Sequence, residues 1–186
     1  MNILLVTSAT KGSNTSVLNR EFILRAELKG RAVRVLDARK ANHCIGCRSC
    51  EKLHFCPRFS DTFQISKDKL EKVIVFSGAI YSFGLNSALC SALNRLSFMT
   101  SEHTVFGLIL CSGSFGRYSG LDIIESQFAR FDEYCGTHTV PIVNKVTNDE
   151  RHPLYEIDKV KISELLENLE EAYNIEKIGS QKESGK

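Results

Sequence analysis

The sequence has no apolar run long enough to cross a membrane. Its first run, "ILLV" (3–6), leads directly into polar residues, and no later run approaches the required length. A membrane-spanning helix needs about 20 mostly apolar residues, and the core of a secretion signal needs about 7–15. We therefore expect a cytoplasmic protein. The 186 residues can bury a complete core, which favours a single domain.

A strong charge imbalance is also missing. The chain has 24 Lys and Arg residues against 22 Asp and Glu, for a net charge of +2, and the two signs are interspersed. Proteins that bind nucleic acid or anionic membranes usually concentrate basic residues on one surface. The composition therefore favours neither kind of partner.

Side chains for acid–base or nucleophilic catalysis do not gather into a recognisable set. The histidines are scattered and show no triad or metal-binding spacing, so each is interpreted as a surface or capping residue. They are His43, His54, His103, His138 and His152.

Cysteine is the residue type that stands out. Seven cysteines are an odd number, and no secretion signal accompanies them, so a disulfide framework is excluded. Cys90, Cys111 and Cys135 stand alone in apolar surroundings and are predicted to be small buried hydrophobic residues. The other four fall between residues 44 and 56, and such clusters usually bind metal or undergo redox chemistry.

Strand and helix patterns alternate along the whole chain. This alternation predicts an α/β, doubly wound, five-stranded parallel sheet with helices on both faces. Pro141 suggests that the last strand lies at an edge. A long connection over 39–62 holds the clustered cysteines, the domain is expected to span 1–175, and 176–186 are expected to form a polar, frayed tail. Strands are predicted at 2–6, 31–38, 72–83, 104–114 and 137–146, and helices at 16–30, 63–70, 86–98, 120–136 and 155–175.

The loop "TSATKGSNTS" (7–16) is rich in hydroxyl groups and precedes a predicted helix. Free backbone amides at a helix N-terminus attract anions, and Ser, Thr and Asn side chains can add donors. The same residue types are also ordinary helix caps, so both interpretations stay open. The loop matches neither a Walker phosphate loop nor the three-glycine dinucleotide fingerprint. A terminal phosphate would suit it.

Two further loops follow the third and fourth predicted strands. The segment 77–87 offers Tyr81 and Phe83, and the segment 111–120 offers glycines with Phe115 and Tyr118. In doubly wound sheets, ligands bind outside the carboxyl ends of the strands. The competing interpretations are that Tyr81 packs on the neighbouring helix and that 111–120 is a plain flexible loop. Together, one phosphate cradle and two aromatic walls are what a flavin mononucleotide requires.

The same residues carry a resemblance to a known family. "SATKGSNTSVL" (8–18) resembles the phosphate loop of the NADPH-dependent FMN reductase group of the flavodoxin-like superfamily, and "VIVFSGAIYSFGLNSALCSALNR" (73–95) resembles that group's flavin-contacting segment. The resemblance covers about residues 1–140. It implies a flavodoxin-like fold that binds FMN, with NAD(P)H as a candidate electron donor.

The resemblance also implies which residues bind the cofactor. Lys11 would supply the positive charge that relatives often carry one position earlier. The phosphate would be held by Ser8, Thr10, Lys11, Ser13, Asn14 and Thr15, one side of the ring by Gly78, Ala79, Ile80, Tyr81, Ser82 and Phe83, and the other side by Ser112, Gly113, Ser114, Gly116 and Tyr118.

The cysteine run resembles that of the iron–sulfur flavoproteins of the same superfamily. Three cysteines at two-residue intervals, Cys44, Cys47 and Cys50, precede Cys56 and Pro57. Bacterial ferredoxins ligate clusters with a related run that also ends in proline. The run predicts a [4Fe–4S] cluster. Structural zinc, a thiol switch and a run retained without a cluster are the alternatives.

These observations predict an FMN-dependent oxidoreductase or electron-transfer flavoprotein. Its chemistry would be centred on the flavin, so no catalytic side chain is assigned. The first alternative is a cluster-free NAD(P)H-dependent FMN or quinone reductase, and the second is a thiol or metal redox sensor. We expect a redox partner or small-molecule electron acceptor, with no nucleic acid or membrane partner. The resemblance implies a homodimer or homotetramer.

Overall fold

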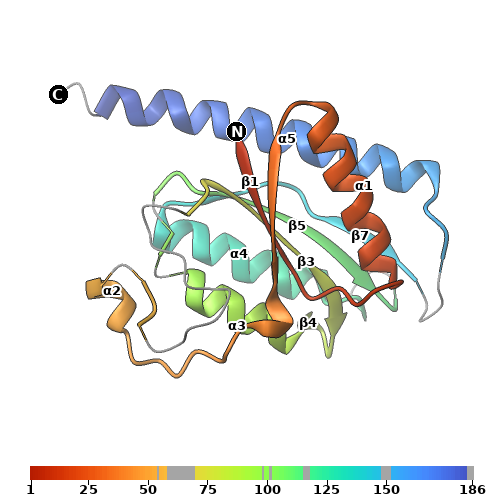
Figure 1. Ribbon diagram of the computed structural model, residues 1–186, viewed down its shortest axis with the longest axis horizontal. Coiled ribbons are helices and arrows are strands. Elements are labelled where there is room, and N and C mark those ends of the chain that lie inside the picture. Colours follow the sequence, from red (N-terminus) through yellow and green to blue (C-terminus); the bar gives the residue numbers. More distant parts are fainter. Residues whose placement is uncertain are drawn as a thin grey trace.

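A parallel β-sheet runs through the middle of the molecule (Figure 1). In this computed structural model the described residues are 1–53, 55–57, 70–97, 99–100, 102–114, 118–147 and 152–183. The strands lie in the order β2-β1-β3-β5-β6, and β7 also pairs with β5. Their bounds are β1 (Asn2–Thr7), β2 (Ala32–Asp37), β3 (Val73–Tyr81), β5 (Val105–Ser112), β6 (His138–Thr139) and β7 (Val143–Val146).

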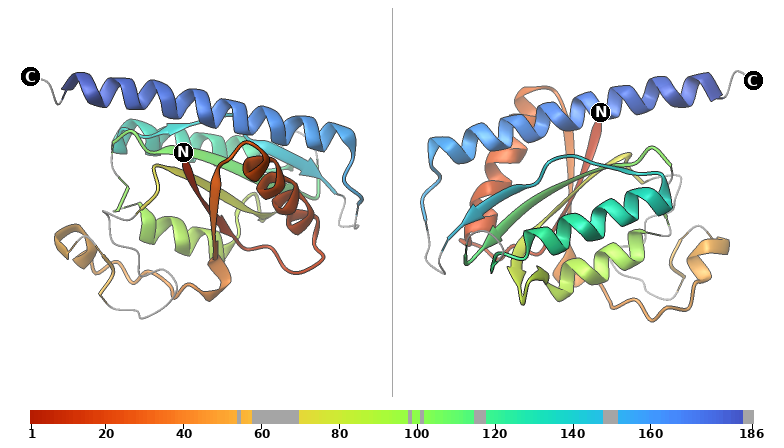
Figure 2. Two further views of the ribbon diagram at one scale, coloured as in Figure 1. Left: turned by 45° about the horizontal axis from the view of Figure 1, so that its top comes forward. Right: turned by 180° about the vertical axis from the view of Figure 1, so that it is seen from behind.

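Helices cover both faces of this sheet (Figure 2). On one face lie α1 (Asn14–Leu28) and α5 (Glu156–Glu183), and on the other lie α3 (Ser87–Leu96) and α4 (Leu121–Cys135). Successive residues of a strand point to opposite faces. Leu4 and Val6 accordingly belong to the core beneath α3 and α4, whereas Ile3 and Leu5 belong to the core beneath α1 and α5. Burial on both faces explains why the strands read as unbroken apolar runs.

The described strands confirm the predicted doubly wound sheet, with two differences. Proline cannot donate to a strand ladder, and Pro141 divides the fifth strand into β6 and β7, which both pair with β5. A short strand that was not predicted, β4 (Gly84–Leu85), folds back antiparallel onto the end of β3. The carboxyl end of β3 is therefore a hairpin.

The structure also bears on the predicted C-terminal tail, the helix predicted at 63–70 and the three isolated cysteines. Helix α5 continues to Glu183, so much of the predicted tail is helical. Of the helix predicted at 63–70, residues 63–69 lie outside the described part of the chain, and Leu70 is not helical. Of the three isolated cysteines, Cys111 is buried as predicted, but Cys90 and Cys135 are only half-buried.

The cysteine-bearing connection leaves β2 through a short 3₁₀ turn, η1 (Ala38–Lys40), and contains the small helix α2 (Ser49–Leu53). In Figure 1 this segment extends away from the sheet on the side of α3. Among the described residues, no helix is both long and apolar enough to cross a membrane.

Candidate functional site

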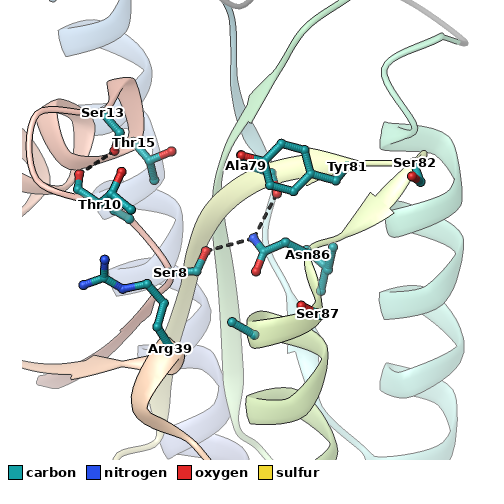
Figure 3. Close-up of a pocket in the computed structure, with 13 residues that line it drawn as sticks. Ser8, Thr10, Ser13, Thr15, Arg39, Ala79, Tyr81, Ser82, Asn86 and Ser87 are labelled. Carbon is teal, nitrogen blue, oxygen red and sulfur yellow. Dashed lines mark hydrogen bonds between the residues drawn. The ribbon is translucent and has the colours of Figure 1, made fainter.

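A cleft of about 650 Å³ opens where β1 and β3 end side by side (Figure 3). Thr7 at the end of β1 pairs with Ser77 in β3 and with Asp37 at the end of β2. The chain leaves β1 toward β2 on one side and returns to β3 on the other, so this is the topological switch point of the sheet. The volume lies within the range of small-molecule sites. The lining residues are Ser8, Ala9, Thr10, Ser13, Thr15, Arg39, Ala79, Tyr81, Ser82, Leu85, Asn86, Ser87 and Ala88.

A buried hydrogen-bond network holds the first residues of the loop after β1. Asn19 of α1 donates from Nδ2 to Thr7 Oγ1 over 2.8 Å, and its Oδ1 accepts from the Ser77 hydroxyl. The backbone amide of Ser8 donates to the Ser77 carbonyl over 2.9 Å, and that of Ala9 donates to Thr7 Oγ1 over 3.0 Å. Because buried polar groups are costly unless paired, this network allows few alternative positions for the loop.

The remainder of this loop both caps α1 and lines the cleft. Ser13 Oγ accepts from the Ser16 amide over 3.2 Å, as an N-cap does, and donates to the Thr10 carbonyl over 2.8 Å. Thr10, Ser13 and Thr15 nevertheless line the cleft. The two interpretations of this loop, helix cap and anion site, are therefore compatible.

Asn86 joins the two sides of the cleft and was missed by the sequence reasoning. Its Nδ2 donates to Ser8 Oγ over 2.8 Å and to the Ala79 carbonyl over 3.0 Å (Figure 3). Its Oδ1 accepts from the amide of Leu89, so Asn86 is also the N-cap of α3. An asparagine directly before an apolar helix is a capping signal that could have identified it.

The β3–β4 hairpin presents Tyr81 to the cleft. Tyr81 pairs with Gly84 across a two-residue turn in which Ser82 (φ 49°) and Phe83 (φ 64°) have left-handed backbones. Turns of this kind usually contain Asn and Gly, because a side chain in that conformation costs about 1 kcal/mol or more. Tyr81 is 67% exposed, so it does not pack beneath a helix. The strained turn holds an aromatic ring at the cleft edge.

Some of the expected binding residues do not line the cleft. Ile80 is buried in the core, and Asn14 Oδ1 accepts from the backbone amide of His152. The third loop is tied to β7, because Ser112 Oγ accepts from Asn144 over 3.0 Å and donates to the Ser114 carbonyl. Gly116, like Phe115, lies outside the described residues. The expected residues outside the cleft lining are Lys11, Asn14, Gly78, Ile80, Phe83, Ser112, Gly113, Ser114 and Tyr118.

Arg39 carries the one formal charge among the described residues that line the cleft. Its Nε donates to Asp37 Oδ1 over 2.8 Å, and its Nη2 donates to Asp37 Oδ2 over 2.7 Å. These hydrogen bonds hold the pKa of the Asp37 carboxyl below its ordinary value. Sequence reasoning missed Arg39, because 30 residues separate it from Ser8 in the chain.

The four clustered cysteines line one small hollow, together with Arg95 of α3, which is only 2% exposed. Cys44 and Cys47 are exposed, whereas Cys50 and Cys56 are half-buried. Burial raises the pKa of the Cys50 thiol, and the neighbouring thiols raise it further. A hydrogen bond of 2.7 Å between His43 Nδ1 and Ser91 Oγ ties the start of this segment to α3. Within the described ranges, no three His, Cys, Asp or Glu side chains are grouped so that they could hold a metal ion.

Comparison with solved structures identifies the fold. A flavodoxin from Streptococcus pneumonia TIGR4 matches 91% of this chain over 97% of its own length, with a TM-score of 0.60 at 12% identity. Flavodoxin 1 from Bacillus cereus matches 92% over 98% of its length, with a TM-score of 0.61 at 9% identity. The rubredoxin oxygen:oxidoreductase of Desulfovibrio gigas matches 94% over 36% of its length, with a TM-score of 0.63 at 11% identity. No family model and no curated protein matches the sequence. The chain therefore has the predicted flavodoxin-like fold.

Proposed function

We propose that this protein binds FMN in the cleft between β1 and β3 and works as an electron-transfer flavoprotein. The observation that carries the proposal is the position of the cleft. In flavodoxin-like sheets FMN binds at the switch point between the first and third strands, and here that point holds a hydroxyl-rich loop on one side and Tyr81 on the other. The resemblance of 8–18 and 73–95 to FMN reductases supports the same assignment.

Each part of the cleft has a distinct task in this proposal. Ser8, Thr10 and Thr15 would hold the phosphate with hydroxyl and backbone donors, while Ala79, Tyr81 and Ser82 would border the flavin ring. Ser13 would hold the loop in shape, because its amide and its hydroxyl both donate to the Thr10 carbonyl. FMN supplies the capacity to exchange electrons singly or in pairs, and the chain supplies binding and orientation. Asn86 keeps the two halves of the site at a fixed separation.

Flavin titration tests the proposal. Flavin-free protein is expected to quench FMN fluorescence with a stoichiometry of about one per chain. Tyr81→Ala should weaken FMN binding by about tenfold, because an aromatic contact contributes roughly 0.5–1.5 kcal/mol beyond its buried area. Tyr134 is 88% exposed on α4, so Tyr134→Ala is the matched control and should bind like the wild type. Absence of FMN binding to the wild type would rule the proposal out.

The resemblance also supports a more specific activity, an oxidoreductase linked to NAD(P)H with FMN as cofactor. Its acceptor would be a redox partner or a small molecule such as a quinone, and we infer a homodimer or homotetramer on the same basis. Steady oxidation of NADH or NADPH with added quinone would support the reductase. If neither NADH nor NADPH reduces the bound flavin, the result would favour a pure electron carrier.

A [4Fe–4S] cluster on Cys44, Cys47, Cys50 and Cys56 is a second candidate. The cysteine spacing and the shared hollow support it, although the four thiols are not grouped as metal ligands in this structure. After anaerobic purification, a cluster protein should contain about four irons and four acid-labile sulfides per chain. Cys47→Ser should then lose iron, and the control Cys90→Ser should keep it. Flavin without iron or sulfide would favour the thiol switch or the cluster-free reductase.

A further inference from the structure

Arg39 reaches the cleft from the turn that follows β2, whereas the loops that line the cleft follow β1 and β3. It lies in η1, directly after β2, and its side chain extends to the side of the cleft formed by Ser8 and Thr10 (Figure 3). The pairing of Thr7 with Asp37 places the end of β2 beside the start of the hydroxyl-rich loop. The position of Arg39 is thus a consequence of the sheet itself.

The Asp37 carboxylate accepts hydrogen bonds from only some of the N–H donors of the Arg39 guanidinium. Asp37 accepts from Nε and from Nη2, and it also accepts from the Arg39 backbone amide over 3.0 Å. An arginine has five N–H donors in a rigid fork. Within the described part of the chain, these bonds leave Nη1 available to donate to a ligand. Asp37 therefore holds the side chain in place without using all of its donors.

A flavin phosphate needs more than neutral hydroxyl groups. Near pH 7 a phosphate monoester carries a charge between about −1.5 and −2. The serine and threonine hydroxyls supply donors without charge, and Lys11 does not line the cleft. Hydrogen bonds between a guanidinium and a phosphate are roughly twice as strong as neutral ones. Arg39 is therefore placed to distinguish a phosphorylated flavin from an unphosphorylated one.

We propose that Arg39 is the phosphate-recognition residue of the cleft and that Asp37, by sharing its guanidinium, limits the affinity for the phosphate. The proposal rests on FMN binding as proposed above. It assigns the preference for FMN over riboflavin to a residue outside the loop that resembles the family's phosphate loop.

Three variants test this assignment by comparing the dissociation constants of FMN and riboflavin. Arg39→Met should weaken FMN binding by about 10–100-fold, because a hydrogen bond to a charged group is lost, and should change riboflavin binding by less than about twofold. Asp37→Asn keeps an acceptor for Arg39 but removes a negative charge, so it should tighten FMN binding by about threefold. Arg34→Met is the matched control, because Arg34 lies in β2, the strand that leads into η1, and forms a similar bidentate pair with Glu71. It should bind both flavins like the wild type.

The outcomes separate this proposal from the proposed function. A wild type that binds neither flavin overturns FMN binding itself. A wild type that binds FMN, with an Arg39→Met variant that binds FMN equally well, overturns only the role of Arg39. Equal weakening of FMN and riboflavin by Arg39→Met would show a structural effect and also overturn it. Weaker FMN binding by Asp37→Asn would overturn the role given to Asp37.

Discussion

Gly78→Ala is expected to lower the affinity for FMN by about 100-fold. A Cβ atom at this position would lie 2.4 Å from Ser8 Oγ, 2.6 Å from Leu89 Cδ1 and 2.7 Å from Asn86 Nδ2. It would therefore occupy the space in which Asn86 donates to Ser8. Displacement of binding groups by about 1 Å can cost on the order of 100-fold in function, and overpacking costs about 1–3 kcal/mol of stability. Flavin titration and urea unfolding measure the two effects.

Gly84→Ala is the control for this prediction. Gly84 belongs to the same hairpin, but an added Cβ would have no atom within 4 Å. We expect FMN affinity within about twofold of the wild type and stability within about 0.5 kcal/mol. If Gly78→Ala bound FMN as tightly as Gly84→Ala, the Ser8–Asn86 contact could not be what determines the width of the cleft.

Gly120→Ala is expected to destabilise the protein by about 3 kcal/mol and to weaken FMN binding as a consequence. Gly120 precedes α4 with a left-handed backbone (φ 76°), and an added Cβ would lie 2.5 Å from the Cα, C and O atoms of Phe83. The left-handed conformation costs alanine about 1 kcal/mol, and the clash adds about 1–3 kcal/mol. Backbone atoms cannot rotate away as a side chain can. The hairpin that carries Tyr81 therefore has to move.

Gly30→Ala isolates the conformational part of this cost. Gly30 also has a left-handed backbone (φ 69°), but an added Cβ would meet nothing within 4 Å. Urea unfolding should show a loss of about 1 kcal/mol for Gly30→Ala and a clearly larger loss for Gly120→Ala. If both variants lost the same free energy of unfolding, the clash between residue 120 and Phe83 would add no cost. The close contact between the start of α4 and the hairpin would then not contribute to stability.

One part of the site could be predicted from the sequence because its signals are local. The loop from Ser8 to Thr15 is rich in hydroxyl residues and lies between an apolar strand and a helix, and Tyr81 lies near the end of the longest apolar strand pattern. Both features depend on neighbours within about ten residues. The structure accordingly places Ser8, Thr10, Ser13, Thr15 and Tyr81 in one cleft.

The residues that the sequence reasoning missed depend on contacts between distant segments. Arg39 reaches the cleft because β2 pairs with β1, and Asn86 reaches Ser8 because β3 pairs with β1 on the other side. Arg39 has no local signal in the sequence, and the signal at Asn86 is that of a helix cap, which does not reveal its contact with Ser8. Ser112 likewise has contacts that its local sequence does not reveal, because its hydroxyl accepts from Asn144 and donates to the Ser114 carbonyl.

By itself, the sequence determined the doubly wound sheet, because a strand buried on both faces must be apolar at every position and each such run is visible without any partner. It also determined which loops end these strands. Only the tertiary structure decided which of those loops share a cleft, that Arg39 brings a positive charge to it, and how the four cysteines lie around Arg95. The physical reason is that strand order and side-chain direction arise from packing between segments far apart in the chain. The composition of one segment does not indicate which other segment it packs against.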